Sequence, residues 1–180
     1  MKSILLSIKP KYAELIASGK KTIEVRKSAP KEVPFKCYIY MTQGAYKDLG
    51  LYSEGIYQNR MKVIGEFICD KVYNLVNAFG GIVFADENLN QLEPQLFRDM
   101  SCLTDEQTAD YLGDKDGYGW HISDLKIYDK PKPIMQFYKP CPIKIKNCPV
   151  CEFYSTYTGC CMNNIDRPPQ SWQYVDELEK

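Results

Sequence analysis

The sequence lacks any apolar run long enough to cross a membrane. A transmembrane helix needs about 20 consecutive apolar residues. The apolar stretch near the N-terminus is broken early, at Lys9 and Pro10. It is also too short for the core of a secretory signal, and no small-residue cleavage site follows it. These absences predict a cytoplasmic protein without membrane contact.

Histidine and net charge are also scarce. The 180 residues include a single histidine, and 23 basic side chains balance 23 acidic ones. The balanced total is unlike that of a polybasic nucleic-acid-binding protein. Hydrophobic residues make up 44% and charged residues 26% of the chain, which is typical of globular proteins rather than disordered ones. The length fits one domain, or one domain with an appendage.

The balanced charge conceals segregation along the chain. Residues 1–40 carry nine basic and three acidic side chains, whereas residues 84–116 carry nine acidic and two basic ones. Residues 130–147 contain five lysines and no acidic residue. One interpretation is two solvated surfaces without a partner. The other is a basic face for a polyanion, with the acidic segment folded away from it.

The N-terminal segment predicts a strand, a helix and a second strand. Residues 3–8 are apolar and β-branched, as in a short strand. Pro10 suits the first turn of a helix of about ten residues, which Gly19 ends. Residues 21–27 alternate with period two, which directs two apolar side chains to a core and three polar ones to a cleft or solvent. In order, these are Ile23 and Val25, then Thr22, Glu24 and Arg26.

The rest of the chain predicts further short strands and a helical, acidic middle. Strands are expected at 36–41, at 61–70 with a bulge at Gly65, at 120–128 with an end at Asp129 and the prolines, and within 137–146. Residues 43–60 predict a long loop. Thr104 and Gln107 form a candidate capping box for a helix through Leu112. The pattern indicates an α+β fold, a small mixed barrel with helical insertions.

The most informative motif runs from Gly19 to Arg26 and has the form G-x-K-x-x-E-x-R. Lys21 lies at the bend between helix and strand, where its ammonium can turn into a cleft. Glu24 and Arg26 share one strand face, about 7 Å apart along the strand. The carboxylate can orient the guanidinium, and the guanidinium can bind a phosphate in a bidentate way. The alternative is a salt bridge on an exposed strand.

This motif resembles the signature of the ASCH domain family, which is related to the PUA RNA-binding fold. Residues 7–27 resemble the family's opening strand, helix and strand, and residues 36–42 and 62–72 look like its next two strands. Residues 118–131 are similar to a late strand of bacterial and phage-borne ASCH proteins. The resemblance spans about residues 2–139. It implies a PUA-like mixed β-barrel with peripheral helices.

The resemblance also implies a ligand and a site. RNA or a nucleotide would bind a cleft floored by Lys21, Glu24 and Arg26, with Lys9 as a further ligand contact. Some ASCH proteins are amidohydrolases that deacylate modified cytidine, and others look like ribonucleases. The amidohydrolases match this chain at Lys21 and Arg26, but they use a threonine nucleophile where this chain has Glu24. Thr22 is not at the matching position, so whether the chain is an enzyme stays open.

Several aromatic and histidine side chains have two interpretations each. His121 is a candidate catalytic group beside Lys21 and Glu24 in a hydrolase, or a structural hydrogen-bonding residue. Tyr40 and Trp120, together with Tyr38, are candidates for stacking on bases. Their alternative role is packing in a core.

Five of the eight cysteines cluster between residues 141 and 161. Cys148 and Cys151 form a C-x-x-C knuckle, whose spacing lets two thiolates reach one tetrahedral Zn²⁺. Cys141 and Cys160 complete a candidate structural Cys₄ zinc site, and Cys161 is an alternative to Cys160. Free thiols or a disulfide are the other outcomes. The isolated cysteines are expected to be small buried hydrophobic residues; they are Cys37, Cys69 and Cys102.

These features predict two units. Residues 1–139 form the ASCH domain, and residues 140–180 form a cysteine-rich C-terminal extension. Trp172 and Tyr174 are expected to pack back onto the barrel. A third functional alternative is a protein-interaction module that acts through this extension.

Overall fold

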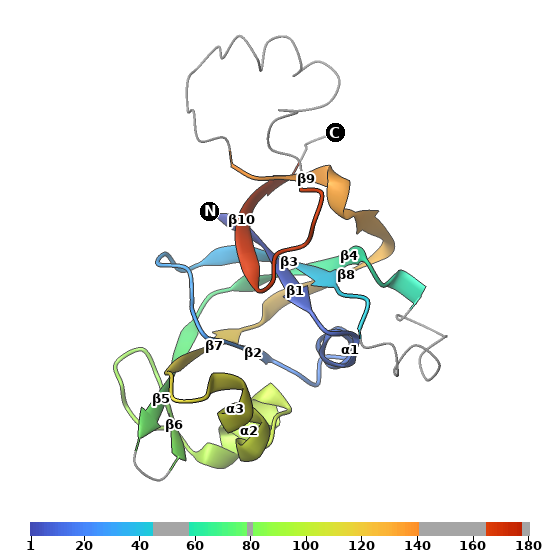
Figure 1. Ribbon diagram of the computed structural model, residues 1–180. Coiled ribbons are helices and arrows are strands. Elements are labelled where there is room, and N and C mark those ends of the chain that lie inside the picture. Colours follow the sequence, from blue (N-terminus) through green and yellow to red (C-terminus); the bar gives the residue numbers. More distant parts are fainter. Residues whose placement is uncertain (45–57, 79–80, 141–164, 178–180) are drawn as a thin grey trace.

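The structure is a computed structural model that describes residues 1–44, 58–78, 81–140 and 165–177 (Figure 1). Most of the predicted loop at 43–60 and all five clustered cysteines lie outside the described residues. None of the helices described is long and apolar enough to cross a membrane.

Two curved sheets form the body of the described molecule (Figure 1). The larger sheet has six strands, in the order β8 (Ser123–Pro133), β4 (Lys62–Cys69), β3 (Phe35–Met41), β1 (Ser3–Ile8), β10 (Trp172–Glu177) and β9 (Phe137–Tyr138). The smaller sheet has four, in the order β2 (Ile23–Arg26), β7 (Gly117–His121), β5 (Val72–Ala78) and β6 (Gly81–Ala85). The larger sheet curls into a half-barrel with few helices around it, which confirms the predicted α+β class.

Helix α1 (Pro10–Ala17) links β1 to β2, as predicted, although it has eight residues rather than about ten. Pro10 occupies the first turn, where its missing N–H costs no hydrogen bond. Gly19 follows the helix with φ of 72°, a left-handed conformation that glycine adopts without steric cost. The sharp stop at Gly19 directs the next residues into β2.

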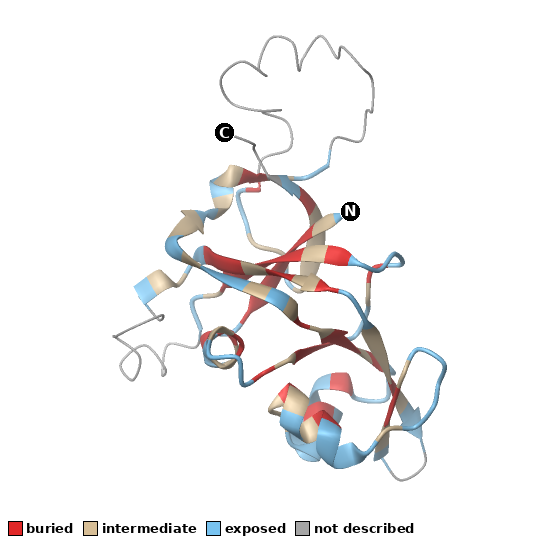
Figure 2. Ribbon diagram, turned by 180° about the vertical axis from the view of Figure 1, so that it is seen from behind, coloured by how far each residue is buried: buried red, intermediate tan, exposed pale blue. Residues whose placement is uncertain are grey.

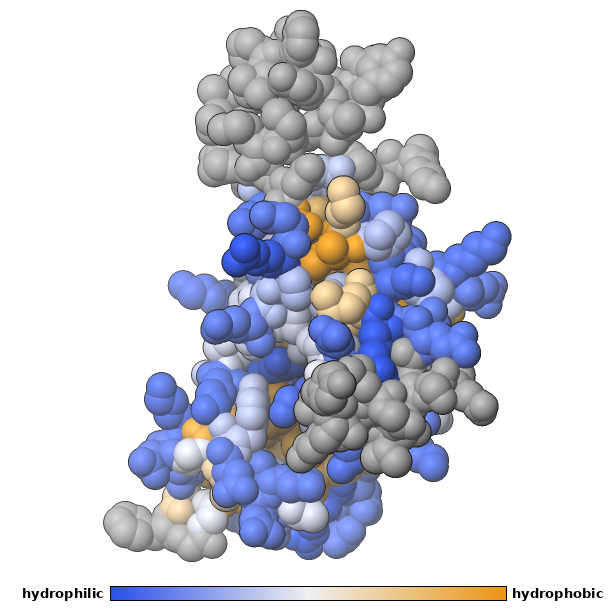
Figure 3. All heavy atoms as spheres, turned by 45° about the vertical axis from the view of Figure 1, so that its right-hand side comes forward, coloured by the Kyte–Doolittle hydropathy of each residue, from blue (hydrophilic) through white to orange (hydrophobic). Residues whose placement is uncertain are grey.

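The largest apolar core joins the two sheets. It combines buried side chains of β1, β3, β4 and α1 with Trp120 and Ile122, and the Trp120 ring meets Phe35 edge to face. Figure 2 shows buried residues concentrated along the central strands. Figure 3 shows one face dominated by hydrophilic side chains, with apolar side chains gathered into a smaller patch. Because Trp120 belongs to β7, this core fixes the smaller sheet against the larger one.

Helices α2 (Pro94–Ser101) and α3 (Asp105–Leu112) cover one face of the smaller sheet. The predicted capping box is confirmed, because the Thr104 side chain accepts from Gln107 N–H and the Gln107 side chain accepts from Thr104 N–H. Phe97 and Leu112 pack with Ile23 of β2 in a second core. The acidic segment is therefore attached directly to the strand that carries the motif.

The prediction of one strand over residues 120–128 is wrong, because the segment contains parts of two strands and the second one ends later than expected. The chain divides at Ile122 into β7 and β8, which belong to different sheets. Asp124, at the start of β8, has a left-handed φ of 47°. β8 continues to Pro133, beyond the predicted end at Asp129. It is an edge strand, where a proline without N–H breaks no ladder hydrogen bond that the sheet needs.

The bulge predicted in β4 lies beside Gly65. The pairing of β3 with β4 shifts register between Ile39 and Tyr40, opposite this point. A Cβ at Gly65 would lie 2.5 Å from the Lys126 carbonyl oxygen, so the close approach of β8 requires glycine there.

The C-terminal strand β10 lies inside the larger sheet, between β1 and β9. Its residues Trp172 and Tyr174 pack against the main core, as expected. The division of the chain at residue 139 stays a prediction. Strands β5 and β6 had no prediction from the sequence, although residues 72–85 are apolar apart from Asn74, Asn77 and the Gly80-Gly81 pair, a pattern typical of a hairpin.

Candidate functional site

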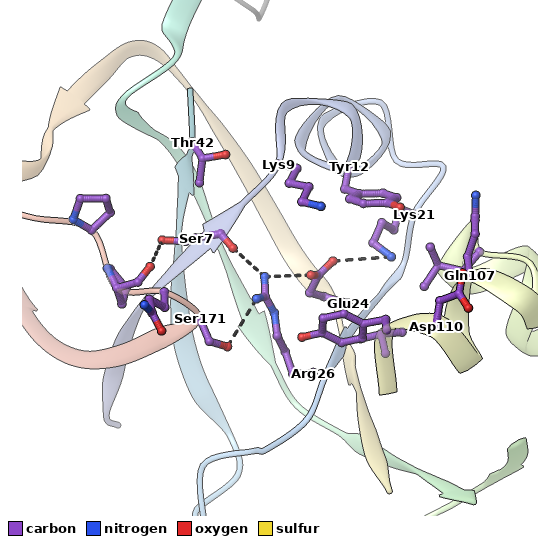
Figure 4. A pocket seen from close by; sticks show the side chains of 16 residues that line it. Ser7, Lys9, Tyr12, Lys21, Glu24, Arg26, Thr42, Gln107, Asp110 and Ser171 are labelled. Atoms are coloured by element: carbon purple, nitrogen blue, oxygen red, sulfur yellow. Dashed lines mark hydrogen bonds and ion pairs between the residues drawn. The ribbon is translucent and has the colours of Figure 1, made fainter. Parts of the chain in front are cut away.

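A cleft of about 760 Å³ opens beside the sequence motif (Figure 4). Its walls come from β1 and α1, from β2, from α3, and from the segment that precedes β10. The residues that line it include Ser7, Lys9, Tyr12, Lys21, Glu24, Arg26, Thr42, Gln107, Asp110, Tyr111, Pro169 and Ser171. The volume is within the range of small-molecule sites in proteins.

Lys21, Glu24 and Arg26 form the floor of the cleft and are only 2%, 6% and 7% exposed. Glu24 lies between the two cations: its Oε2 is 3.5 Å from Lys21 Nζ, and its Oε1 is 2.9 Å from Arg26 Nη2. The motif residues are therefore brought together as their spacing predicted, and the alternative of an exposed surface salt bridge is wrong. Their roles toward a ligand stay predictions.

Lys21 is held by backbone as well as by charge. Its Nζ donates to the Ser101 carbonyl oxygen at 2.6 Å and lies 5.5 Å from the centroid of the Tyr12 ring. Burial lowers the pKa of Lys21 below 10.5, and the carboxylate of Glu24 opposes that shift. Burial and the same carboxylate raise the pKa of Tyr12. The Lys21 ammonium is thus enclosed, and its protonation depends on the few groups around it.

Arg26 connects three parts of the chain. Its Nη2 donates to the Ser7 carbonyl oxygen at 2.7 Å, and its Nη1 donates to Ser171 Oγ at 3.4 Å. Ser7 Oγ donates in turn to the Pro169 carbonyl oxygen at 2.6 Å. Within the described residues, Arg26 Nε has no hydrogen-bond partner. Because Nη2 is already engaged by Ser7 and Glu24 and Nε is enclosed by protein atoms, the donor that remains for a ligand is the second N–H of Nη1.

The opposite wall is acidic, contrary to the expectation that the acidic segment folds away from the basic one. Gln107, Asp110 and Tyr111 of α3 line the same cleft as Lys21 and Arg26. The reason is the apolar face of β2, which packs with α3 in one core and brings the helix to the cleft edge.

His121 does not line the cleft. Directly opposed residues of an antiparallel pair point to the same face, and His121 is opposed to Ile23, while Glu24 is opposed to Trp120. His121 therefore lies on the face opposite to Glu24, with Nδ1 2.7 Å from Asp70 Oδ1. The structure therefore does not bring His121 together with Lys21 and Glu24, and the structural alternative fits the contact with Asp70.

Tyr40 and Trp120 are buried in two different cores and are 1% and 0% exposed. Because their faces are covered by other side chains, the prediction that they stack on bases is wrong. Tyr38 is buried beside Tyr40. Lys9, in contrast, is exposed and lines the cleft.

Sequence reasoning missed several lining residues. Ser7, Ser171, Thr42 and the α3 side chains carry no motif, and Ser171 meets Arg26 across 145 positions of sequence. The sequence did contain one relevant signal, the capping box at Thr104, which predicted helix α3 but not its position beside the cleft. Thr22 lies outside the lining, and its backbone N–H donates to Met100.

The isolated cysteines divide into two kinds. Cys37 and Cys69 are buried, as predicted, and burial raises the pKa of both thiols, that of Cys69 to about 12. Cys102 differs: it is half-buried and ends α2 in a left-handed conformation, so its prediction as core is wrong. Within the described residues, no group of three or more histidine, cysteine or acidic side chains is placed to hold a metal. Cys141, Cys148, Cys151, Cys160 and Cys161 lie outside them.

Comparison with known proteins identifies relatives of this fold. Residues 6–65 match the model of the ASCH domain family. The fold is similar to the crystal structure of ASCH from Zymomonas mobilis, with a TM-score of 0.55 and 18% identity over 97% of this chain and 88% of that one. A tyrosine-to-phenylalanine variant of that protein gives a TM-score of 0.53 and 16% identity, covering 98% and 91%. No curated protein matches the chain significantly.

Proposed function

Since the chain carries an ASCH domain, we propose that it binds RNA or a nucleotide in the cleft above Lys21, Glu24 and Arg26. ASCH domains are related to the PUA RNA-binding fold, and the cleft supplies cations for a phosphate. Lys9 stands exposed at the cleft, whereas Lys21 and Arg26 lie at its floor.

One observation carries this proposal. The floor holds two buried cations, Lys21 and Arg26, against the single carboxylate of Glu24. Buried charge that is not fully balanced by opposite charge is costly. An anion that enters the cleft balances the excess positive charge, so the site is better completed by an anion than by solvent alone.

The charges have separate tasks in this proposal. Glu24 fixes the position of the Arg26 guanidinium through the 2.9 Å contact. Lys9 is free to reach a phosphate outside the floor and contributes mainly long-range attraction. Lys21 keeps the floor cationic while its ammonium stays bonded to Ser101.

Salt dependence of RNA binding tests the proposal. Removing one contact between a lysine and a phosphate reduces the slope of log affinity against log salt concentration by about one. We expect this reduction in Lys9→Ala. The matched control is Lys31→Ala, which removes an exposed lysine of the same basic segment that does not line the cleft. Binding without salt dependence, or an equal effect of the two variants, contradicts the proposal.

A second candidate is hydrolysis of RNA or of a modified nucleoside in the same cleft. The observation that favours it is the burial of Lys21, which lowers its pKa toward the range useful for proton transfer, although the nearby Glu24 carboxylate opposes the shift. In an enzyme, Glu24→Gln abolishes turnover while nucleotide affinity survives. Binding with no turnover in the unaltered chain rejects this candidate and leaves the first intact.

The cysteine cluster supports a separate proposal that rests on spacing alone. Cys141, Cys148, Cys151 and Cys160, or Cys161 in place of Cys160, would hold a structural zinc ion. Metal analysis of the purified chain should give one equivalent, and less than about half an equivalent contradicts the proposal. If the extension is instead a protein-interaction module, replacing these cysteines removes a bound partner and leaves RNA affinity unchanged.

A further inference from the structure

Three side chains of α3 face the buried motif from the other side of the cleft. Gln107, Asp110 and Tyr111 are exposed, line the cleft and are spaced so that they share one helical face. Figure 4 shows Gln107 and Asp110 at one end of the site and Ser7 and Ser171 at the other. The helix lies outside residues 6–65, so the family match does not describe it.

The capping box fixes what Gln107 can offer. Its Oε1 accepts from the Thr104 N–H at 3.2 Å, and its own N–H donates to Thr104 Oγ1 at 3.1 Å. Because the amide oxygen is occupied, the side chain presents its Nε2 hydrogens to a ligand. Gln107 is therefore a donor held in position by the start of its own helix.

Asp110 offers the complementary chemistry. Within the described residues it makes no hydrogen bond and no ion pair, so both carboxylate oxygens can accept. In a cleft for a phosphate, this charge repels the ligand unless it meets a donor edge of that ligand. A carboxylate accepts two parallel N–H groups in the fork geometry typical of bidentate pairs.

Tyr111 supplies the exposed ring that Tyr40 and Trp120 do not. Tyr111 is 39% exposed and lines the cleft, and Lys27 Nζ lies over its ring, 5.3 Å from the centroid. Because the ammonium covers one face of the ring, a base would stack on the other face.

We propose that α3 makes the cleft selective for guanine. The base stacks on Tyr111, its N1–H and N2–H donate to Asp110, and its O6 accepts from Gln107 Nε2. Of the four RNA bases, only guanine presents two adjacent donors next to an acceptor on this edge. The proposal rests on the proposed function, because the attached phosphate is held on the side of Arg26 and Lys9.

The test measures the affinity of the full chain for GMP, AMP, CMP, UMP and IMP, which is GMP without the N2 amine. We expect GMP to bind tightest and IMP about tenfold more weakly, since one base contact is lost. Asp110→Asn should abolish the difference between GMP and IMP. The matched control is Glu106→Gln, an exposed residue of the same helix that does not line the cleft and should preserve the difference.

Stacking on Tyr111 is tested separately from the hydrogen bonds to the edge of the base. Tyr111→Leu should weaken all the nucleotides by a similar factor of about five or more, because stacking does not depend on the base. Tyr111→Phe keeps the ring and should bind normally. Comparing GMP with a guanosine-containing trinucleotide then distinguishes a free nucleotide from RNA as the source of the base.

The outcomes separate the two proposals. Equal affinity for all the nucleotides overturns guanine selectivity and leaves nucleotide binding in place. A guanine preference that survives in Asp110→Asn also overturns it, because the donor edge is then recognised elsewhere. If no nucleotide and no RNA binds, the proposed function fails and the selectivity fails with it.

Discussion

The two sides of the cleft are built in opposite ways. The floor consists of buried charges, Lys21, Glu24 and Arg26, fixed by one another and by backbone carbonyl oxygens. The α3 wall carries exposed polar side chains, of which Asp110 has no hydrogen-bond partner within the described residues. A fixed, desolvated charge provides a strong but unselective anchor, whereas an exposed side chain on a helix can be exchanged without harm to the fold. In the two proposals, the floor supplies affinity and the wall supplies selectivity.

The largest expected effect is the loss of Glu24. Glu24→Ala leaves two buried cations without their shared carboxylate, and breaking a buried ion pair from one side costs about 3–5 kcal/mol. Urea unfolding measures the change in the free energy of unfolding. A loss as small as that of an exposed ion pair would mean that the floor is solvated and that the contrast with the wall is false.

The pH dependence of stability isolates Lys21. Because burial lowers the pKa of Lys21, the unfolded chain binds its proton more tightly, and stability rises with pH between the folded pKa and the unfolded value of 10.5. The buried thiols of Cys37 and Cys69 have raised pKa values and lower the stability as pH rises over part of the same range. The rise due to Lys21 should therefore appear in urea midpoints, measured up to about pH 9.5, as the difference between the unaltered chain and Lys21→Met.

Lys21→Met should remove the contribution of Lys21 from the pH profile, while Lys31→Met, which alters an exposed lysine, should retain it. The neighbouring groups that act on the pKa of Lys21 are Glu24, Cys102 and Arg26. If the slope is the same in both variants, the rise belongs to another group and Lys21 is not the group that titrates.

A smaller effect is expected from the capping box of α3. Thr104→Ala removes the acceptor for the Gln107 N–H and should lower the free energy of unfolding by about 1 kcal/mol. Thr104→Ser keeps the hydroxyl and should restore most of the loss. Thermal unfolding of the three proteins measures the difference, and equal stability of all three would show that the cap does not hold the wall.

The smallest effect is expected at the exposed ion pair of the wall. Arg98 Nη1 and Asp105 Oδ2 lie 2.9 Å apart, but the Asp105 side chain is 74% exposed. Asp105→Asn should therefore cost less than about 1 kcal/mol, and salt should reduce even that. A cost comparable to that of Glu24→Ala would remove the distinction between floor and wall.

Local rules predicted the opening of the fold well. Pro10 and Gly19 set the ends of α1, and the alternation after Gly19 placed Glu24 and Arg26 on one face of β2. These are consequences of backbone sterics and of strand periodicity, which act over a few residues. The capping box at Thr104 was predictable for the same reason.

Elsewhere the sequence interpretation failed where the structure depends on contacts between residues far apart in the sequence. Adjacent residues of a strand point to opposite faces, as Trp120 and His121 do, but which of the two faces the cleft depended on the antiparallel register with β2. The break at Ile122 separates two sheets in a stretch that alternates like one strand. An aromatic residue such as Tyr40 can belong to a binding site or to a core. Tyr40 belongs to a core because Phe137 and Val175, distant in the sequence, pack in the same cluster.

By itself, the sequence determined the motif: a lysine at the bend, then a carboxylate and a guanidinium on one face of a short strand. Those positions follow from covalent spacing and need no distant partner. Only the tertiary structure decided that these charges are buried, that Ser7 and Ser171 hold Arg26, and that the acidic helix forms the opposite wall. Burial and opposition depend on which apolar faces pack together, and β2 packs with α3, which lies far from it in the sequence.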